Sequence, residues 1–141
     1  MSATFRHSLA IIIATRDHPQ ELRRTLTSLE GQSVLPRQVI LADGGARTVE
    51  GVVEEFPRLP IVYRRVHPPA LARQQNLAVN EVEPSADLIG FMDDDIVLEP
   101  GSLEAMLAFW EQAPPEVGGA AFNIVNNTAP PRAVWLKSLF G

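Results

Sequence analysis

The chain has 141 residues and a net charge of −5 at neutral pH. Its length and its 45% of hydrophobic residues are enough for one domain with its own core. The acidic balance argues against a general nucleic-acid-binding protein, and the absence of cysteine excludes disulfides. No apolar stretch is long enough for a membrane span, and no signal-peptide pattern opens the chain. We therefore expect a cytoplasmic protein, which a longer chain could hold at a membrane surface.

Short apolar runs and helical patterns alternate along the chain. Residues 8–14 are almost continuously apolar and β-branched, which is typical of a parallel strand covered on both faces. Leucines then recur at helical spacing between Pro19 and Gly31, which favour a helix start and a helix end. Further strands are predicted at residues 38–42, 61–65, 88–92 and 117–125. Further helices are predicted at residues 48–56, 71–82 and 101–112. This alternation predicts one α/β domain over residues 1–141, with three layers and a Rossmann-like, mostly parallel sheet.

Three adjacent carboxylates, Asp93, Asp94 and Asp95, separate the apolar run 88–92 from a second apolar run. In an extended chain, side chains two residues apart point the same way, so Asp93 and Asp95 are expected to face one site while Asp94 points elsewhere. Two converging carboxylates suit Mg²⁺ or Mn²⁺, which prefer oxygen ligands and share them with phosphates. The alternative is a solvated acidic turn. We favour a functional site, because the two apolar runs put the acids at the edge of a core.

Polar residues gather where the predicted strands end. Thr15, Arg16 and Asp17 follow the first strand, Asp43 follows the second, and the three carboxylates follow the fourth. Open parallel sheets bind ligands at the carboxyl ends of their strands, so these residues predict a binding site there. For Asp17 we favour a cap on the following helix, and Asp43 has a turn cap as its alternative role.

Three segments of the chain follow one another in a characteristic order, namely residues 11–22, residues 39–45 and the Asp-X-Asp segment at 88–100. Together they resemble the nucleotide-binding half of family 2 glycosyltransferases of the GT-A fold, and the resemblance continues through Thr25, Ser28 and Gln32. It extends over almost the whole chain, and the three segments together are far more specific than an Asp-X-Asp motif alone.

The resemblance implies a nucleotide site and a metal site. Ala14 and Thr15 would lie beside the base, and Asp43 would hold the uracil or ribose part of the nucleotide. An Arg–Asn pair near the sugar diphosphate is implied at Arg73 and Asn76. In the motif, the first carboxylate, Asp93, would lie near the ribose and metal, and the second, Asp95, would bind the metal (Mn²⁺ or Mg²⁺) directly.

The implied activity is inverting transfer of a sugar from a nucleotide diphosphate sugar to an acceptor hydroxyl. The family's general base lies further along the chain, and neither Glu111 nor Glu116 lies in a recognisable base motif, so no catalytic residue is assigned. We expect the GT-A sheet to be incomplete at its C-terminal end. The sequence departs from the family at Gly44 and Ala46, which follow Asp43, and at Gln75, which precedes Asn76. The sequence therefore leaves the nucleotide, the sugar and the acceptor open.

Two other functions are considered. One is a nucleotide-binding module without catalysis, because the base and the acceptor region are missing. The other is a Mg²⁺-dependent receiver-type signalling domain, whose acids should lie on the first and third strands with a late lysine on a strand, whereas Lys137 lies in the apolar tail 133–141. An open sheet edge or an exposed apolar face is expected to favour self-association.

Overall fold

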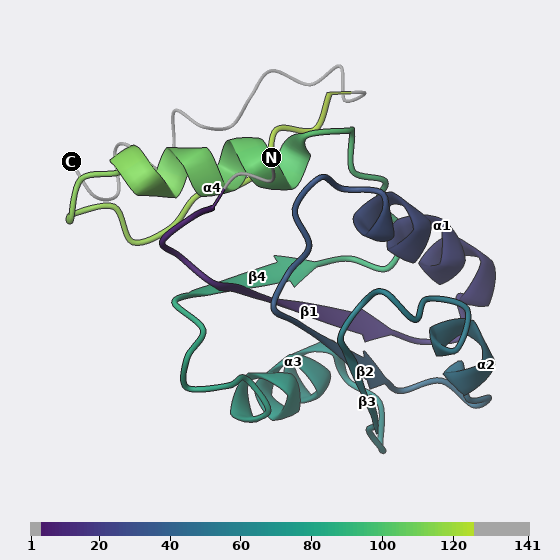
Figure 1. Ribbon diagram of the computed structural model, residues 1–141. Helices are drawn as coiled ribbons and strands as arrows, with labels where there is room; N and C mark the ends of the chain where they lie inside the picture. The colour runs from purple at the N-terminus through teal and green to yellow at the C-terminus, as the bar shows by residue number, and fades with distance from the viewer. Residues whose placement is uncertain (1–3, 126–141) are drawn as a thin grey trace.

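A computed structural model describes residues 4–125 (Figure 1). Within this range the chain forms four strands and four helices in strict alternation. The elements are β1 (Leu9–Thr15), α1 (Pro19–Glu30), β2 (Gln38–Asp43), α2 (Glu50–Val53), β3 (Ile61–Arg65), α3 (Leu71–Asn80), β4 (Leu88–Met92) and α4 (Ser102–Gln112). The first four predicted strands and all four predicted helices are confirmed. The apolar tail at residues 133–141, including Lys137, lies outside the described residues.

The predicted fifth strand at 117–125 is wrong. These residues form no strand, and most of them are exposed. Gly118 and Gly119 have no side chains that could pack on a sheet, and neighbouring alanines favour strands only weakly. Two helices are also shorter than predicted. Helix α2 ends at Val53 and α3 at Asn80. Tight turns follow, in which the N–H groups of Glu55 and Phe56, and of Glu81 and Val82, bond to the carbonyl three residues back.

The described strands form one parallel sheet in the order β3-β2-β1-β4. Strand β1 pairs with β2 on one side and with β4 on the other, so Thr15 lies beside Asp43, and Ile13 beside Met92. The chain adds strands in one direction from β1 to β3 and then returns to the other side of β1. The gap between the carboxyl ends of β1 and β4 is therefore the topological switch point at which such sheets bind ligands.

Helices cover both faces of the sheet, which confirms the predicted three layers (Figure 1). Leucines of α1 and α4 pack with the odd-numbered residues of β1 in the larger core. On the other face, Ala78 of α3 packs against Ile12 and Ile40 in the smaller core. The buried leucine stripe of α1 and the alternation along β1 thus follow directly from the sequence pattern.

One edge of the sheet carries exposed apolar side chains. Within residues 4–125, β4 pairs only with β1, and Ile89 and Phe91 are 44% and 57% exposed. This is the kind of edge from which the sequence predicts self-association, which stays a prediction. No helix in the described range is long and apolar enough to cross a membrane.

Candidate functional site

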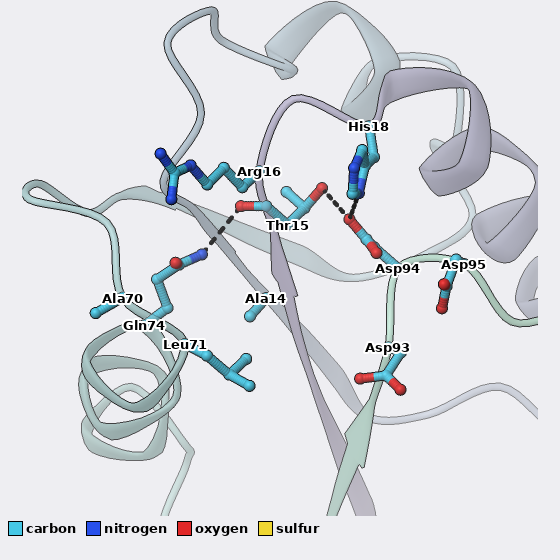
Figure 2. Close-up of a pocket in the computed structure, with 10 residues that line it drawn as sticks. All are labelled: Ala14, Thr15, Arg16, His18, Ala70, Leu71, Gln74, Asp93, Asp94 and Asp95. Atoms are coloured by element: carbon cyan, nitrogen blue, oxygen red, sulfur yellow. Dashed lines mark hydrogen bonds and ion pairs between the residues drawn. The ribbon is translucent and has the colours of Figure 1, made fainter.

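A pocket of about 350 Å³ lies at the switch point between the carboxyl ends of β1 and β4 (Figure 2). Its walls come from β1 and the loop after it, from the start of α3 and from the loop after β4. The lining residues are Ala14, Thr15, Arg16, His18, Ala70, Leu71, Gln74, Asp93, Asp94 and Asp95. Four of the seven site residues expected from the sequence, namely Ala14, Thr15, Asp93 and Asp95, therefore lie together.

The middle carboxylate of the acidic loop differs from its neighbours. The Asp94 side chain is 13% exposed and turns toward β1, where its Oδ2 atom accepts a hydrogen bond from the Thr15 hydroxyl at 2.8 Å. The Nδ1 atom of His18 lies 3.2 Å from the same oxygen. Figure 2 shows the carboxylates of Asp93 and Asp95 directed away from this pair. All three acids nevertheless line the pocket, and Asp94 and Asp95 lie in a turn rather than in extended chain. That Asp93 and Asp95 face one site stays a prediction.

Polar side chains on α1 and just after its end hold the backbone of the acidic loop. Thr25 and Ser28 lie three residues apart on one side of α1, and Gln32 follows the C-cap residue Gly31. The Thr25 hydroxyl lies within hydrogen-bond distance of the carbonyl oxygens of Asp94 (2.9 Å) and Ile96 (2.7 Å). Ser28 and Gln32 bind main-chain atoms further along, at Leu98, Glu99 and Leu103. Helix α1 thus fixes the path of the chain from the acids to α4.

The donor set fits a hard divalent cation. Asp93 and Asp95 are exposed carboxylates at the pocket, and Mg²⁺ or Mn²⁺ commonly binds one or two carboxylates and completes its shell with phosphates and water. The described residues contain no group of three or more His, Asp or Glu side chains that could hold a metal ion by themselves. The metal-ligand roles of Asp93 and Asp95 stay a prediction.

Asp43 lies at the end of β2, outside the lining of this pocket, and is fully buried. Its Oδ1 atom accepts a hydrogen bond from the Gly45 N–H, and its Oδ2 atom accepts bonds from the Tyr63 hydroxyl, the Val49 N–H and Arg65 Nη1 at 2.7 Å. Burial opposes the charged form, but the bonds from Tyr63, Gly45 and Arg65 outweigh it and hold the pKa of Asp43 below its usual range. Both oxygens therefore stabilise the turn after β2, and its nucleotide contact stays a prediction.

Arg73 and Asn76 are exposed on α3 and do not line the pocket. The Nη1 atom of Arg73 donates a long hydrogen bond, 3.4 Å, to the carbonyl oxygen of Pro68. The structure therefore does not bring this pair to the acids, and their roles near a sugar diphosphate stay predictions.

Asp17 does not cap α1, so that interpretation is wrong. Its φ of 56° turns it away from the helix, and its Oδ1 atom accepts a hydrogen bond from the N–H of Ala46 at 2.8 Å. Asp17 instead ties the loop after β1 to the loop after β2.

Gln74 is a pocket residue that the sequence did not reveal. It is 3% exposed, and its Nε2 atom donates to the carbonyl oxygens of Thr15 (3.0 Å) and Ala42 (2.9 Å). It thereby joins α3 to the ends of β1 and β2. Gly44 leaves room for it, since a Cβ on Gly44 would lie 2.8 Å from Gln74 Oε1. The sequence contains one signal that could have identified Gln74, since it lies four positions before Ala78 and therefore on the same, buried side of α3.

Comparisons with known proteins give matches to one sequence family and to several solved structures. The sequence profile described as glycosyl transferase family 2 matches residues 10–138. Among solved structures, S. aureus TarS aligns with a TM-score of 0.67 at 19% identity, over 74% of this chain and 20% of that one. TarS 1-349 in complex with UDP-GlcNAc aligns with a TM-score of 0.63 at 19% identity, over 74% of this chain and 31% of that one. The corresponding UDP complex aligns with a TM-score of 0.63 at 20% identity, over 74% of this chain and 32% of that one.

These structures share the GT-A fold with this chain, which confirms the predicted fold class. The chain covers only between a fifth and a third of their lengths. No curated protein matches the sequence.

Proposed function

The chain belongs to glycosyl transferase family 2, and from this we propose that its pocket binds a nucleotide diphosphate sugar with a divalent cation, for transfer of the sugar to an acceptor hydroxyl. The observation that carries the proposal is the pair of exposed carboxylates, Asp93 and Asp95, across the switch point from the polar end of β1. Family membership, together with carboxylates that follow β4, argues against the receiver-type alternative. A pocket of about 350 Å³ is within the range that holds small ligands.

Different residues of the pocket would contact different parts of the proposed ligand. Asp95 and Asp93 would hold the cation, which when bound neutralises charge on the departing diphosphate. Ala14 and Thr15 supply the wall at the end of β1, and Arg16 and His18 contribute basic side chains around the same pocket. The complexes of TarS with UDP-GlcNAc and UDP make a uridine nucleotide the first candidate.

In the proposed inverting transfer, the acceptor oxygen forms a bond to the anomeric carbon while the bond from that carbon to the diphosphate breaks. The proton of the acceptor hydroxyl passes to a general base. Within residues 4–125, Asp93, Asp94 and Asp95 are the only carboxylates that line the pocket. Glu111 lies on α4 and its carboxylate binds Arg6, with Oε1 2.6 Å from the backbone nitrogen and Oε2 2.9 Å from Nε.

Asp93 and Asp95 are the proposed cation ligands, Asp94 is bonded to Thr15, and Glu111 is bonded to Arg6, so none of these carboxylates is left to act as the general base. This favours a second candidate function for the 141-residue chain, which is nucleotide binding without turnover. Varied acceptors offered together with the donor distinguish the two functions. Release of UDP that depends on the acceptor supports transfer, whereas donor binding without any turnover supports a binding module.

Calorimetric titration of UDP and GDP, each with and without Mn²⁺, tests the binding proposal. We expect one of the nucleotides to bind, and to bind at least about tenfold more tightly with Mn²⁺. Asp95→Ala should remove the effect of Mn²⁺, and Glu54→Ala, which removes an exposed carboxylate near α2, should keep it. Binding that ignores both Mn²⁺ and the Asp95 substitution would count against a metal-dependent nucleotide site.

A further inference from the structure

We infer that Asp94 is a positioning residue of the acidic loop rather than a ligand of the cation, and that it acts through the Thr15 hydroxyl. The inference rests on the proposed function, because it assigns a role within the same site. It concerns the residue that separates the two expected ligands, Asp93 and Asp95.

The contacts of the three acids differ in kind. Asp94 has a largely buried side chain that accepts a hydrogen bond from Thr15 at 2.8 Å, and Thr15 itself is only 2% exposed. In the described part of the chain, the side chains of Asp93 and Asp95 form no hydrogen bond or ion pair with protein, and both are exposed. Asp94 is therefore already bonded to protein, whereas its neighbours are available to a ligand.

Anchoring the middle residue decides where its neighbours point. Asp94 and Asp95 lie in a turn just after β4, and with the Asp94 side chain bonded to Thr15 on β1, the carboxylates of Asp93 and Asp95 are directed away from that contact (Figure 2). The carbonyl oxygen of Asp94 is fixed as well, because it lies 2.9 Å from the Thr25 hydroxyl on α1. The side chain and the backbone of Asp94 are thus tied to two different elements, and the acidic loop is held before any cation arrives.

Asparagine distinguishes a positioning residue from a ligand. An asparagine at position 94 keeps an oxygen that accepts the bond from Thr15 but loses the negative charge. A positioning role needs the acceptor, whereas a cation site of this kind needs the charge. Asp94→Asn and Asp95→Asn should therefore behave in opposite ways although they are chemically the same substitution.

The test is binding of Mn²⁺ in the presence of UDP, followed by electron paramagnetic resonance of the free ion. Asp94→Asn should keep an affinity for Mn²⁺ within about threefold of that of the unsubstituted protein. Asp94→Ala removes the partner of both the Thr15 hydroxyl and His18, and it should weaken Mn²⁺ binding at least about tenfold. Thr15→Val removes one of these two partners and should also weaken Mn²⁺ binding, whereas Thr15→Ser, which keeps the hydroxyl, should not. The Thr15→Val/Asp94→Ala double variant should bind Mn²⁺ no more weakly than Asp94→Ala alone. Asp95→Asn should lose Mn²⁺ binding.

A second measurement needs no metal. Amide hydrogen exchange of residues 93–96 in the metal-free protein should accelerate in Asp94→Ala and Thr15→Val but not in Asp94→Asn, with all variants folded by circular dichroism. If Asp94→Asn loses Mn²⁺ binding as fully as Asp95→Asn, Asp94 is a ligand and the inference is overturned. Unchanged exchange and unchanged Mn²⁺ binding in Asp94→Ala and Thr15→Val would also overturn it. Absence of Mn²⁺ binding by the unsubstituted protein, with the exchange pattern as expected, would instead refute the proposed function.

Discussion

The buried carboxylate of Asp43 gives the strongest stability prediction. Asp43 is fully buried, and its two oxygens accept four hydrogen bonds, one of them from Arg65 at 2.7 Å. Asp43→Asn keeps the shape but removes the charge and turns an NH₂ group toward N–H and O–H donors. We expect a loss of about 3–5 kcal/mol in the free energy of unfolding, as for removal of one partner of a buried ion pair. Proteins of this size are stable by only about 5–15 kcal/mol.

Urea unfolding followed by circular dichroism measures this loss. With a slope of about 2 kcal/mol per molar urea, the midpoint of Asp43→Asn should fall by about 2 M. The surface pair of Arg23 and Glu55, at 2.8 Å, provides a matched control with the same chemistry in solvent. Glu55→Gln should leave the midpoint almost unchanged. If Asp43→Asn lowered the midpoint no further than Glu55→Gln, the buried network would not stabilise the fold.

The same network has a defined pH dependence. The pKa of Asp43 is lowered in the folded protein, because the bonds from Tyr63, Gly45 and Arg65 outweigh the effect of burial. Its stabilising contribution is therefore complete above the unfolded-state pKa of about 3.9 and is lost as the pH falls below that value through the folded-state pKa. The difference in urea midpoint between the unsubstituted protein and Asp43→Asn should be constant from pH 7 to pH 5 and should shrink below pH 4. A difference that grows in acid would contradict this account.

Three further substitutions test packing and charge around the site. Gly44→Ala should destabilise the fold by about 1–3 kcal/mol in urea unfolding, because the new Cβ would lie 2.7 Å from Pro69 Cβ, while Gly51→Ala, with nothing within 4 Å, should not destabilise it. Gln74→Met should cost about 1–3 kcal/mol in the same assay, because it leaves the carbonyl oxygens at the ends of β1 and β2 without their side-chain donor. Asp93→Asn should weaken Mn²⁺-dependent UDP binding in calorimetry without lowering the thermal midpoint, because its exposed side chain bonds to no described residue.

The order of elements could be predicted because it depends on local patterns. The continuous apolar run that became β1 and the leucine stripe of α1 each identify an element without knowledge of its neighbours. The position of the acids at the end of a strand could also be predicted, since Asp93 and Asp95 come directly after an apolar run. The prediction of a fifth strand is wrong because a strand also needs a partner strand and side chains that pack, and Gly118 and Gly119 have no such side chains.

The contacts that shape the pocket could not be predicted, because they join residues far apart in the chain. Thr25 binds the carbonyl of Asp94, 69 residues away, and Gln74 binds the carbonyl of Thr15, 59 residues away. The leucine pattern shows which side of α1 faces the core but not what its polar neighbours bind. The sequence pattern favours a cap on the nearest helix for Asp17, whereas its partner, the N–H of Ala46, lies in the loop after β2.

The central claim is that a divalent cation and a nucleotide meet between β1 and β4. Its most direct test is paramagnetic broadening of the amide spectrum of the 141-residue chain by Mn²⁺ in the presence of UDP. The account predicts that the amide signals of residues 93–95 broaden first, followed by those of Ala14 and Thr15, while those at the opposite ends of the strands, such as Gln38, stay sharp. Broadening centred elsewhere, or none with any nucleotide, would contradict it.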